Sequence, residues 1–443
     1  MAPSRSAPPW RPSSLALALA ASFALPSPAL QSAPGDPVSG ELQASADPAN
    51  SALGIVDVAR RADGGFVVVW GGFGEAASGQ PAPRTLRARL FAANGTPLGA
   101  EFDVSTDRVS PFSPAVAMTP DGRFAVAWRF GFDDADRGIA ARVFAADGTP
   151  VGAARRASAQ AVDTDNVDIA MDAEGGFVVT WNDAGNGVFF RRFGPSGAVK
   201  GAAPTEVAQA PAPKHRTFSA SVAMEPDGDF LVAWDQRTYG ETIYIPGNPY
   251  GFEFGFQSDA VHVRRFHADG SPDGAAIEVD RRNATNAPDP LGQGGAVGNT
   301  QVAVDGDGDF VVVYTSGVST VPGQGIRARR YTATGVAAGP SAQVGRRYVV
   351  SDYSPPDVSM DATGAFAVTW QSAPEVFVRR YSAAGDALAA RVRVNPAHDA
   401  AAFNLVGPAI ARSANGDFAI AWNGVARAEP VEVQDFVRLY AGP

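Results

Sequence analysis

Cysteine is absent from this chain of 443 residues, and histidine is rare, with four copies. Without thiols the protein has no disulfide, no thiolate metal site and no cysteine nucleophile, so its fold must be stabilised by burial alone. The histidines show no HExxH-like spacing, and the sequence contains no Walker loop, no GxSxG elbow and no dinucleotide fingerprint. These absences leave no common catalytic motif on which to base a function.

Charged residues are also scarce, at 19%, and the net charge is -10. An acidic surface repels phosphate backbones, so nucleic acid is not an expected partner. The 48 glycines and 35 prolines indicate many turns and few long solvated helices. An all-β protein is the natural interpretation.

Long apolar runs are missing except near the N-terminus, where residues 13–25 (SSLALALAASFAL) follow two arginines. This run is shorter than the roughly 20 residues that span a bilayer, and a small-x-small cleavage site follows it at Ser27-Pro28-Ala29. The pattern predicts a signal peptide at 1–29 and a short linker at 30–37. We therefore expect a secreted or periplasmic protein without membrane insertion. The Ala/Gly/Pro/Arg-rich composition suggests a high-GC bacterium.

One motif is present in abundance, because the segment DGDGDFVVVY at 305–314 has close copies throughout the chain. Each copy is a turn signal followed by an alternating strand, and such repetition predicts a circular or solenoid array. The seven copies are marked by Phe66, Phe124, Phe177, Phe230, Phe310, Phe366 and Phe418.

Each repeat unit has four expected strands. In the second unit these are 114–118, 124–128, 139–144 and a short segment after the turn at 145–150. Turn residues at both tight connections favour an antiparallel meander. Spacings of 52 to 58 residues, with one of 80, match propeller blades with loop additions. The prediction is an all-β, seven-bladed β-propeller of four-stranded antiparallel blades over 38–443.

The two ends of the chain predict how the ring closes. The segment GELQAS at 40–45 matches the fourth strand of the other units, and the seventh unit ends at 436–443 without one. We expect the N-terminal strand to complete the last blade, which leaves no unpaired sheet edge.

An arginine recurs in every unit, two residues before an aromatic residue of the third strand. It is either a repeated ligand site or a structural clamp that stacks on the tryptophan ending the second strand. The clamp is favoured because the adjacent loops do not repeat. The arginines are Arg89, Arg142, Arg191, Arg264, Arg329, Arg379 and Arg438.

The fourth unit carries the longest insert, residues 236–259, on the face whose loops vary from unit to unit. Its exposed aromatic cluster suits sugar rings or a protein partner. The alternation in FEFGF at 252–256 also fits an extra hairpin with its aromatics packed underneath. The candidate ligand-binding residues are Tyr239, Tyr244, Tyr250, Phe252 and Phe254.

A second candidate site lies on the first strand of each unit, the innermost strand of a propeller blade. The position nine residues before the repeated phenylalanine is Asp57, Asp168 and Asp357 in units one, three and six. Carboxylates that converge at the mouth of the central channel would suit an acid/base pair or a hard cation such as calcium. The alternative is that each carboxylate accepts hydrogen bonds from local backbone or from a clamp arginine.

Calcium is the one cofactor that the sequence suggests, without an assigned ligand set. DGDGD at 305–309 is similar to a calcium loop, but other units have TPDGR or DATGA at this place, as expected of a simple turn.

The units, of the form DGDFVVAW-loop-RRF-x-ADG-x-P-x-G-x-x-x-x-V, resemble repeats of secreted bacterial propeller-like proteins of unassigned function. They are distantly similar to the FG-GAP propeller repeats of integrin-α chains. The resemblance covers about residues 38–443 and implies the fold and an extracellular binding role. FG-GAP calcium loops are denser in aspartate than TPDGR or SANGD.

These observations support two functional hypotheses. The first is an exported, non-catalytic protein that binds a glycan or a surface protein through the aromatic residues of 239–256. The second is a carbohydrate-active hydrolase or lyase that uses Asp57, Asp168 and Asp357. The carboxylates belong to non-adjacent units, which favours the binding hypothesis. A purely structural scaffold is a third possibility.

Overall fold

The structure, a computed structural model, describes residues 33, 35–46, 56–73, 84–105, 112–131, 137–162, 164, 166–183, 186–209, 215–244, 252–283, 297–317, 325–346, 355–372, 374–396, 403–426 and 433–442. The signal peptide expected at 1–29 lies outside these residues and stays a prediction. The described residues form 28 β-strands. None of their segments is a helix long and apolar enough to cross a membrane.

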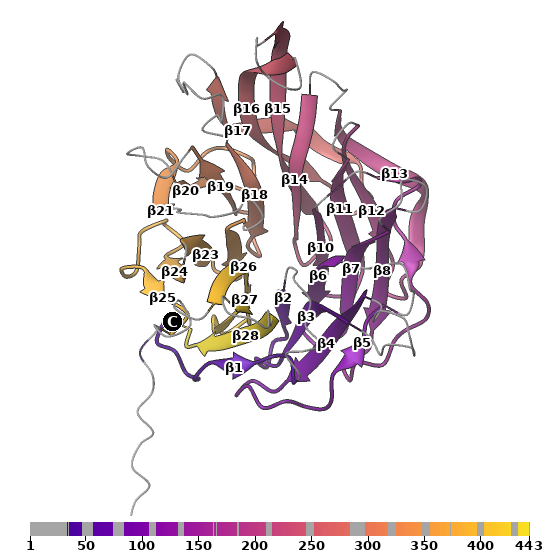
Figure 1. The fold of residues 1–443 in the computed structure, drawn as a ribbon, viewed down its shortest axis with the longest axis vertical. Helices are drawn as coiled ribbons and strands as arrows, with labels where there is room; N and C mark the ends of the chain where they lie inside the picture. The colour runs from indigo at the N-terminus through magenta and orange to yellow at the C-terminus, as the bar shows by residue number, and fades with distance from the viewer. Residues whose placement is uncertain are drawn as a thin grey trace, which may run out of the picture.

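Seven four-stranded antiparallel sheets form a ring, which confirms the predicted seven-bladed propeller (Figure 1). Blade 1 consists of β2 (Asp57–Arg60), β3 (Phe66–Phe73), β4 (Arg84–Phe91) and β5 (Phe102–Asp103). Blade 2 consists of β6 (Phe112–Met118), β7 (Phe124–Phe130), β8 (Gly138–Phe144) and β9 (Arg155–Arg156). Blade 3 consists of β10 (Val167–Met171), β11 (Phe177–Asp183), β12 (Gly187–Phe193) and β13 (Val199–Gln209).

The next three blades repeat this order. Blade 4 consists of β14 (His215–Met224), β15 (Phe230–Tyr244), β16 (Phe252–Phe266) and β17 (Pro272–Asn283). Blade 5 consists of β18 (Val297–Val304), β19 (Phe310–Ser316), β20 (Gly325–Tyr331) and β21 (Ala342–Gly345). Blade 6 consists of β22 (Asp357–Met360), β23 (Phe366–Ser372), β24 (Glu375–Tyr381) and β25 (Val392–Arg393).

Blade 7 joins the two ends of the chain. It consists of β26 (Phe403–Arg412), β27 (Phe418–Ala426), β28 (Val433–Tyr440) and β1 (Leu42–Gln43). Leu42 pairs with Val437, and the N–H of Val38 donates to the carbonyl oxygen of Leu439 at 2.9 Å. The indigo N-terminal strand therefore lies beside the yellow C-terminal strands in Figure 1, as the sequence predicts.

The hydrophobic core lies between the blades. The second strand of each blade begins at the repeated phenylalanine and alternates side chains between its two faces. Phe124, Val126 and Trp128 of blade 2, for example, pack with Val67 and Val69 of blade 1. Seven such clusters of described residues, one at each junction between neighbouring blades, account for the apolar pattern that recurs in the repeats.

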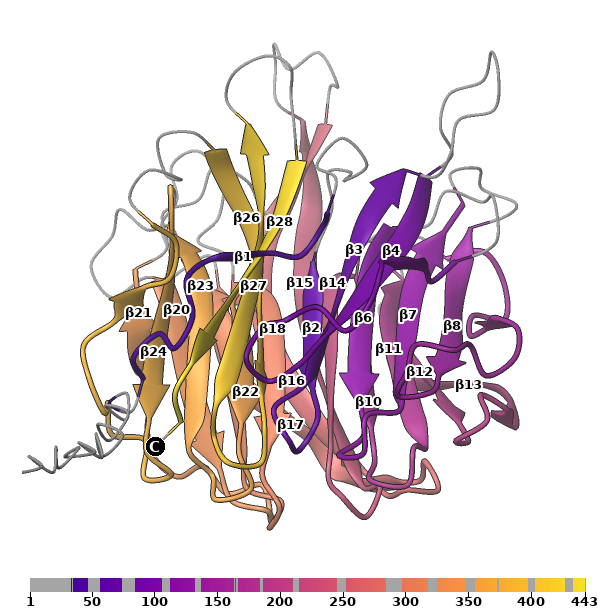
Figure 2. The same ribbon diagram turned by 90° about the horizontal axis from the view of Figure 1, so that it is seen from below.

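The tight turns between the first and second strands all lie on one face of the ring (Figure 2). Each contains a glycine in the left-handed region, with φ of 88° at Gly64 and 97° at Gly122, a conformation that disfavours residues with a Cβ. The DG signal of the repeat is therefore a backbone requirement. In the DGDGD segment, Asp305 accepts the N–H groups of Asp307 and Asp309 at 3.0 and 2.9 Å, so it caps its own turn.

The repeated arginine of the third strand is a structural clamp. Arg142 lies 5.6 Å from the ring centroid of Phe144 and donates to the carbonyl oxygens of Gly152 and Val104, the latter in blade 1. The aromatic partner is thus the residue two positions later in the same strand, and the expected stacking on the tryptophan of the second strand is wrong. The same ring contact is made by Arg89, Arg264, Arg329 and Arg379.

Candidate functional site

The first strands of consecutive blades contact one another around the ring and enclose a cavity of about 90 Å³. The cavity opens where these strands begin, on the face opposite the tight turns, as predicted for the mouth of the channel. Its described lining comes from six blades. It comprises Val56, Asp57, Ser113, Pro114, Ala115, Asn166, Val167, Asp168, Gln301, Pro355, Pro356, Asp357, Gly407, Pro408 and Ala409.

Asp57, Asp168 and Asp357 all line this one cavity. They belong to non-adjacent blades, but the ring brings the same position of every blade to the centre. The equivalent positions of blades 2 and 7 are Ala115 and Ala409, whose small side chains leave space beside the carboxylates. The predicted convergence of the three aspartates is therefore present in the fold.

Each aspartate joins two blades through the same pair of hydrogen bonds. One carboxylate oxygen accepts the N–H of the next residue, and the other accepts an N–H from the first strand of the following blade. For Asp57 the nitrogen–oxygen distances are 2.8 Å to Val58 and 2.7 Å to Val116. For Asp168 they are 2.8 Å to Ile169 and 2.9 Å to Val222. For Asp357 they are 2.7 Å to both Val358 and Ile410.

These bonds confirm that backbone groups hold the carboxylates. A carboxylate offers about four acceptor sites, so each one keeps capacity for a ligand beside its two backbone bonds. The same position in blade 4 is Ser221, whose Oγ accepts the N–H of Val302 in blade 5 at 3.2 Å.

Burial dominates the electrostatics of the three carboxylates. It raises the pKa of Asp57 well above its usual range, and the charges of Asp357 and Asp168 raise it further. Burial raises the pKa of Asp357 to about 7, with a further contribution from the charge of Asp168. Burial also raises the pKa of Asp168, against hydrogen bonds from Val222 and Ser221 that lower it. The charge of Asp168 therefore contributes to the raised pKa of both other carboxylates.

Two amides complete the polar lining. The Oδ1 of Asn166 accepts the N–H of Ala220 at 2.9 Å, which directs the Nδ2 away from that bond. Gln301 contacts the hydroxyl of Ser221 at 2.9 Å, and Ser221 also hydrogen-bonds Asp168. Because a hydroxyl has one proton, Ser221 can donate to only one of these two partners at a time.

Irregular backbone surrounds the cavity. Ser113 and Asn299 are the two non-glycine residues with positive φ in the part of the chain that the structure describes, at 50° and 51°. Both lie at shifts of register just before the inward position of their strand, which is Ala115 in β6 and Gln301 in β18. Gly407, with φ of 59°, has the same place in β26.

Bulges and strained residues concentrate near functional sites and redirect side chains. The sequence analysis did not predict these three irregular positions. A proline follows two of them, since Pro114 comes after Ser113 and Pro408 comes after Gly407.

The aromatic insert forms a hairpin. Its backbone continues β15 and β16 as one long hairpin, in which Tyr239 pairs with Phe256 and Tyr244 with Phe252. This arrangement agrees with the alternative of an extra hairpin. Tyr250 and the side chains of Tyr244, Phe252 and Phe254 lie outside the described residues, so their proposed contacts stay a prediction.

No group of three or more His, Asp or Glu side chains suited to a metal occurs within the described ranges. Calcium binding therefore stays a prediction that rests on the sequence.

No protein-family model and no curated protein matches the sequence of this chain. Solved structures do match its fold. A polysaccharide lyase described as an ulvan lyase shares 10% identity, with a TM-score of 0.49, and 92% of this chain and 94% of that chain are covered. The α-L-arabinofuranosidase from Fusarium graminearum shares 10% identity, with a TM-score of 0.44 and coverage of 90% and 96%. The α-L-arabinanase from Penicillium chrysogenum shares 8% identity, with a TM-score of 0.46 and coverage of 90% and 97%.

These comparisons correct two expectations. The three solved propellers named above are glycan-active proteins and not FG-GAP propellers, so the expected FG-GAP likeness is reduced to the propeller fold itself. The expectation of a non-catalytic binding protein does not match these structures either, which are described as a lyase and glycosidases. With identities of 8–10% the likeness concerns the fold, and the chemistry has to be argued from the cavity itself.

Proposed function

We propose that the protein is an exported, carbohydrate-active enzyme, a hydrolase or lyase that acts at the mouth of the central channel. The observation that supports this most is the gathering of Asp57, Asp168 and Asp357 around one cavity, with raised pKa values that differ in cause and extent. Groups whose environments separate their pKa values are suited to serve as acid and base in one reaction.

We assign the roles from the direction and the cause of each pKa shift. Asp168, whose carboxylate also accepts a hydrogen bond from Ser221, would carry the negative charge and act as base or nucleophile. Asp57, whose pKa is raised by burial and by both neighbouring charges, would stay protonated and act as the acid. Asp357, with a pKa of about 7, titrates near neutrality and would raise the pKa of Asp57 when it is ionised. The proposed substrate is a glycan. The proposed export rests on the signal peptide that the sequence predicts at 1–29.

Single substitutions at the cavity test the proposal. We expect Asp168→Asn to lower kcat on a cleavable polysaccharide by about 100-fold or more, the range found for loss of a catalytic acid or base. Asp57→Asn should have a similar effect. The measurement is the release of reducing ends, with the thermal midpoint of each variant recorded because each aspartate also joins two blades.

Asp147→Asn is the matched control. Asp147 lies in an exposed turn on the far face, where it accepts the N–H of Thr149 at 2.8 Å. This variant should keep the activity of the original protein. If folded Asp57 and Asp168 variants were as active as the control, the cavity would not be the catalytic site.

A further inference from the structure

The described lining of the cavity contains carboxylates, amides, one hydroxyl and apolar groups, and among those residues there is no lysine, arginine or histidine. Arginine is otherwise frequent around the ring, where the clamp arginines bond to backbone carbonyls at the blade junctions. All charged groups in the described lining are therefore carboxylates, which come from blades 1, 3 and 6.

This charge selects against anionic substrates. A uronic acid residue in the cavity would place its carboxylate beside an ionised Asp168, and the two charges repel strongly in a partly desolvated site. Elimination from a uronic acid polymer also requires that the substrate carboxylate be stabilised as negative charge develops next to it. No described lining residue supplies a positive charge for that purpose.

Neutral sugars fit the same lining. Their hydroxyl groups both donate and accept hydrogen bonds, and the cavity offers acceptors on the carboxylates and a donor on Asn166. The Oδ1 of Asn166 is occupied by the N–H of Ala220, which can only donate, so the amide orientation is determined by the backbone. Its Nδ2 has no acceptor within the described residues and is available to a substrate hydroxyl.

The cavity has room for more than a single water molecule, because about 10–15 Å³ of such space holds one water and the cavity offers about 90 Å³. Part of a sugar and an attacking water can therefore lie beside the carboxylates.

We infer that the cavity hydrolyses a neutral glycan and does not cleave uronic acid polymers by elimination, with Asn166 as a positioning residue for a substrate hydroxyl. This inference rests on the proposed function. In the step itself, Asp57 protonates the leaving glycosidic oxygen as the carbon–oxygen bond breaks. Water supplies the new carbon–oxygen bond, and its proton passes to Asp168. The products are two shorter glycans, and water is the one co-reactant.

The test compares two sets of polymers with the full chain. Arabinan, xylan and galactan are neutral, whereas ulvan, alginate and polygalacturonate are acidic. Reducing ends report any cleavage, and ultraviolet absorbance of the new carbon–carbon double bond reports elimination alone. We expect reducing ends from at least one neutral polymer, no double-bond absorbance, and kcat/KM at least 100-fold lower on every acidic polymer.

The failures are distinguishable. Double-bond absorbance, or hydrolysis of an acidic polymer at a comparable rate, would overturn the inference and leave the proposed enzyme standing. Absence of cleavage of all six polymers would count against both. Cleavage of a neutral polymer alone would support both.

Asn166→Asp tests the positioning role, and the pH profile of kcat/KM is recorded because the new carboxylate also adds negative charge to the cavity. The new carboxylate keeps an acceptor for the N–H of Ala220 and removes the Nδ2 donor, so the bond between blades 3 and 4 is retained. We expect KM to rise and kcat/KM to fall about tenfold or more on the neutral polymer. Loss of one hydrogen bond to the substrate, together with an added negative charge, has an effect of this size. Unchanged kcat/KM in this variant would show that Asn166 does not contact the substrate.

Discussion

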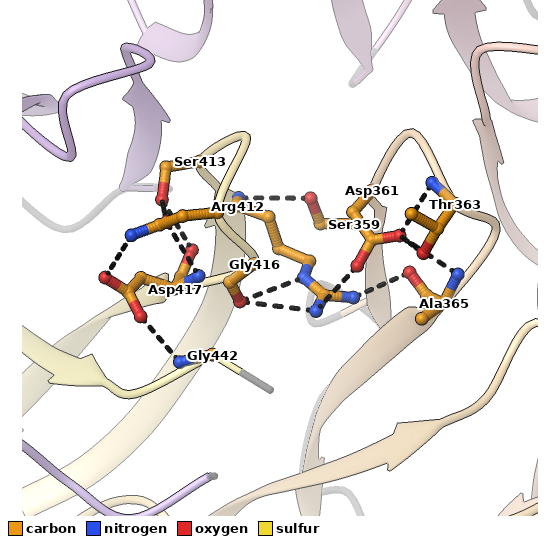
Figure 3. A network of polar contacts seen from close by, with 10 residues as sticks. Ser359, Asp361, Thr363, Ala365, Arg412, Ser413, Gly416, Asp417 and Gly442 are labelled. Carbon is orange, nitrogen blue, oxygen red and sulfur yellow. Dashed lines mark hydrogen bonds and ion pairs between the residues drawn. The ribbon is translucent and has the colours of Figure 1, made fainter. Parts of the chain in front are cut away.

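Arg412 shows how one side chain joins two blades at the turn face. Its guanidinium lies 3.0 Å from the Oδ2 of Asp361, and the exposed fractions of the two side chains are 5% and 6%. It also donates to the carbonyl oxygens of Ala365 and Gly416, so blade 7 is bonded to the first turn of blade 6 (Figure 3). The same strand position is methionine in other blades, among them Met224 and Met360.

Replacing Arg412 by methionine tests how much the ion pair between Arg412 and Asp361 contributes to stability. We expect Arg412→Met to lower the free energy of unfolding by about 3–5 kcal/mol, because it leaves the buried carboxylate of Asp361 without a counter-charge. Adding Asp361→Asn should recover part of the loss. Chemical denaturation followed by tryptophan fluorescence measures both.

Arg61→Met is the control, since Arg61 pairs at 2.6 Å with Asp63, whose side chain is 65% exposed. An exposed pair contributes roughly 0–1 kcal/mol. If the two methionine variants lost equal stability, burial would not be the reason for the effect at Arg412.

At the scale of elements, the cavity aspartates connect the innermost strands. Asp357 at the start of β22 bonds to the N–H of Ile410 in β26, and Asp57 bonds β2 to β6 in the same way. The electrostatics of the cavity and the stability of the ring are therefore coupled, because the carboxylates at the channel mouth also hold neighbouring blades together.

This coupling predicts a pH dependence of stability. The pKa of Asp357 is raised to about 7 in the folded protein, and its usual value in an unfolded chain is about 4. The folded state therefore binds the proton more tightly, so this contribution is fully present below about pH 4 and is lost as the pH rises to about 7. We expect a decrease on the order of 1 kcal/mol after allowance for partial exposure of the side chain.

The measurement is the thermal midpoint between pH 4 and pH 8. Asp357→Asn cannot titrate, so its midpoint should fall less over this range than that of the original protein. The midpoint of the variant should still fall somewhat as the pH rises, because burial also raises the pKa values of Asp57 and Asp168. Parallel curves for the two proteins would contradict a raised pKa at Asp357.

At the scale of the whole molecule, ring closure depends on the few residues of β1. Leu42 packs in the core cluster shared by blades 7 and 1, and Ala44 is fully buried there. β1 also covers the outer edge of β28, which would otherwise present unpaired backbone groups.

A chain beginning at residue 47 should therefore be less stable than one beginning at residue 33. We expect a loss of about 2 kcal/mol or more, equivalent to a thermal midpoint lower by roughly 5 °C, because the edge of β28 is exposed. Size-exclusion chromatography should also show association through that edge. Identical midpoints and elution of the two chains would mean that the ring does not depend on β1.

Much of the architecture was predictable because the information is local and repeated. The glycine turns, the alternating Phe-x-Val-x-Trp strands and the unpaired segments at both ends recur or complement one another in the sequence. A strand that is hard to assign in one unit is supported by the same pattern in the other six units. The stacking partner of the clamp arginines was not predictable, because which ring lies within reach depends on the geometry between neighbouring strands.

The sequence by itself determined the number of blades, the order of strands and the place of closure, since these follow from hydrogen-bonding period and turn chemistry along the chain. Only the tertiary structure decided which side chains meet. Asp57, Asp168 and Asp357 are separated by whole blades in the sequence and share one cavity because the ring places equivalent positions around a common centre. Their raised pKa values and the orientation of Asn166 arise from burial and from backbone donors of the next blade, which no local pattern encodes.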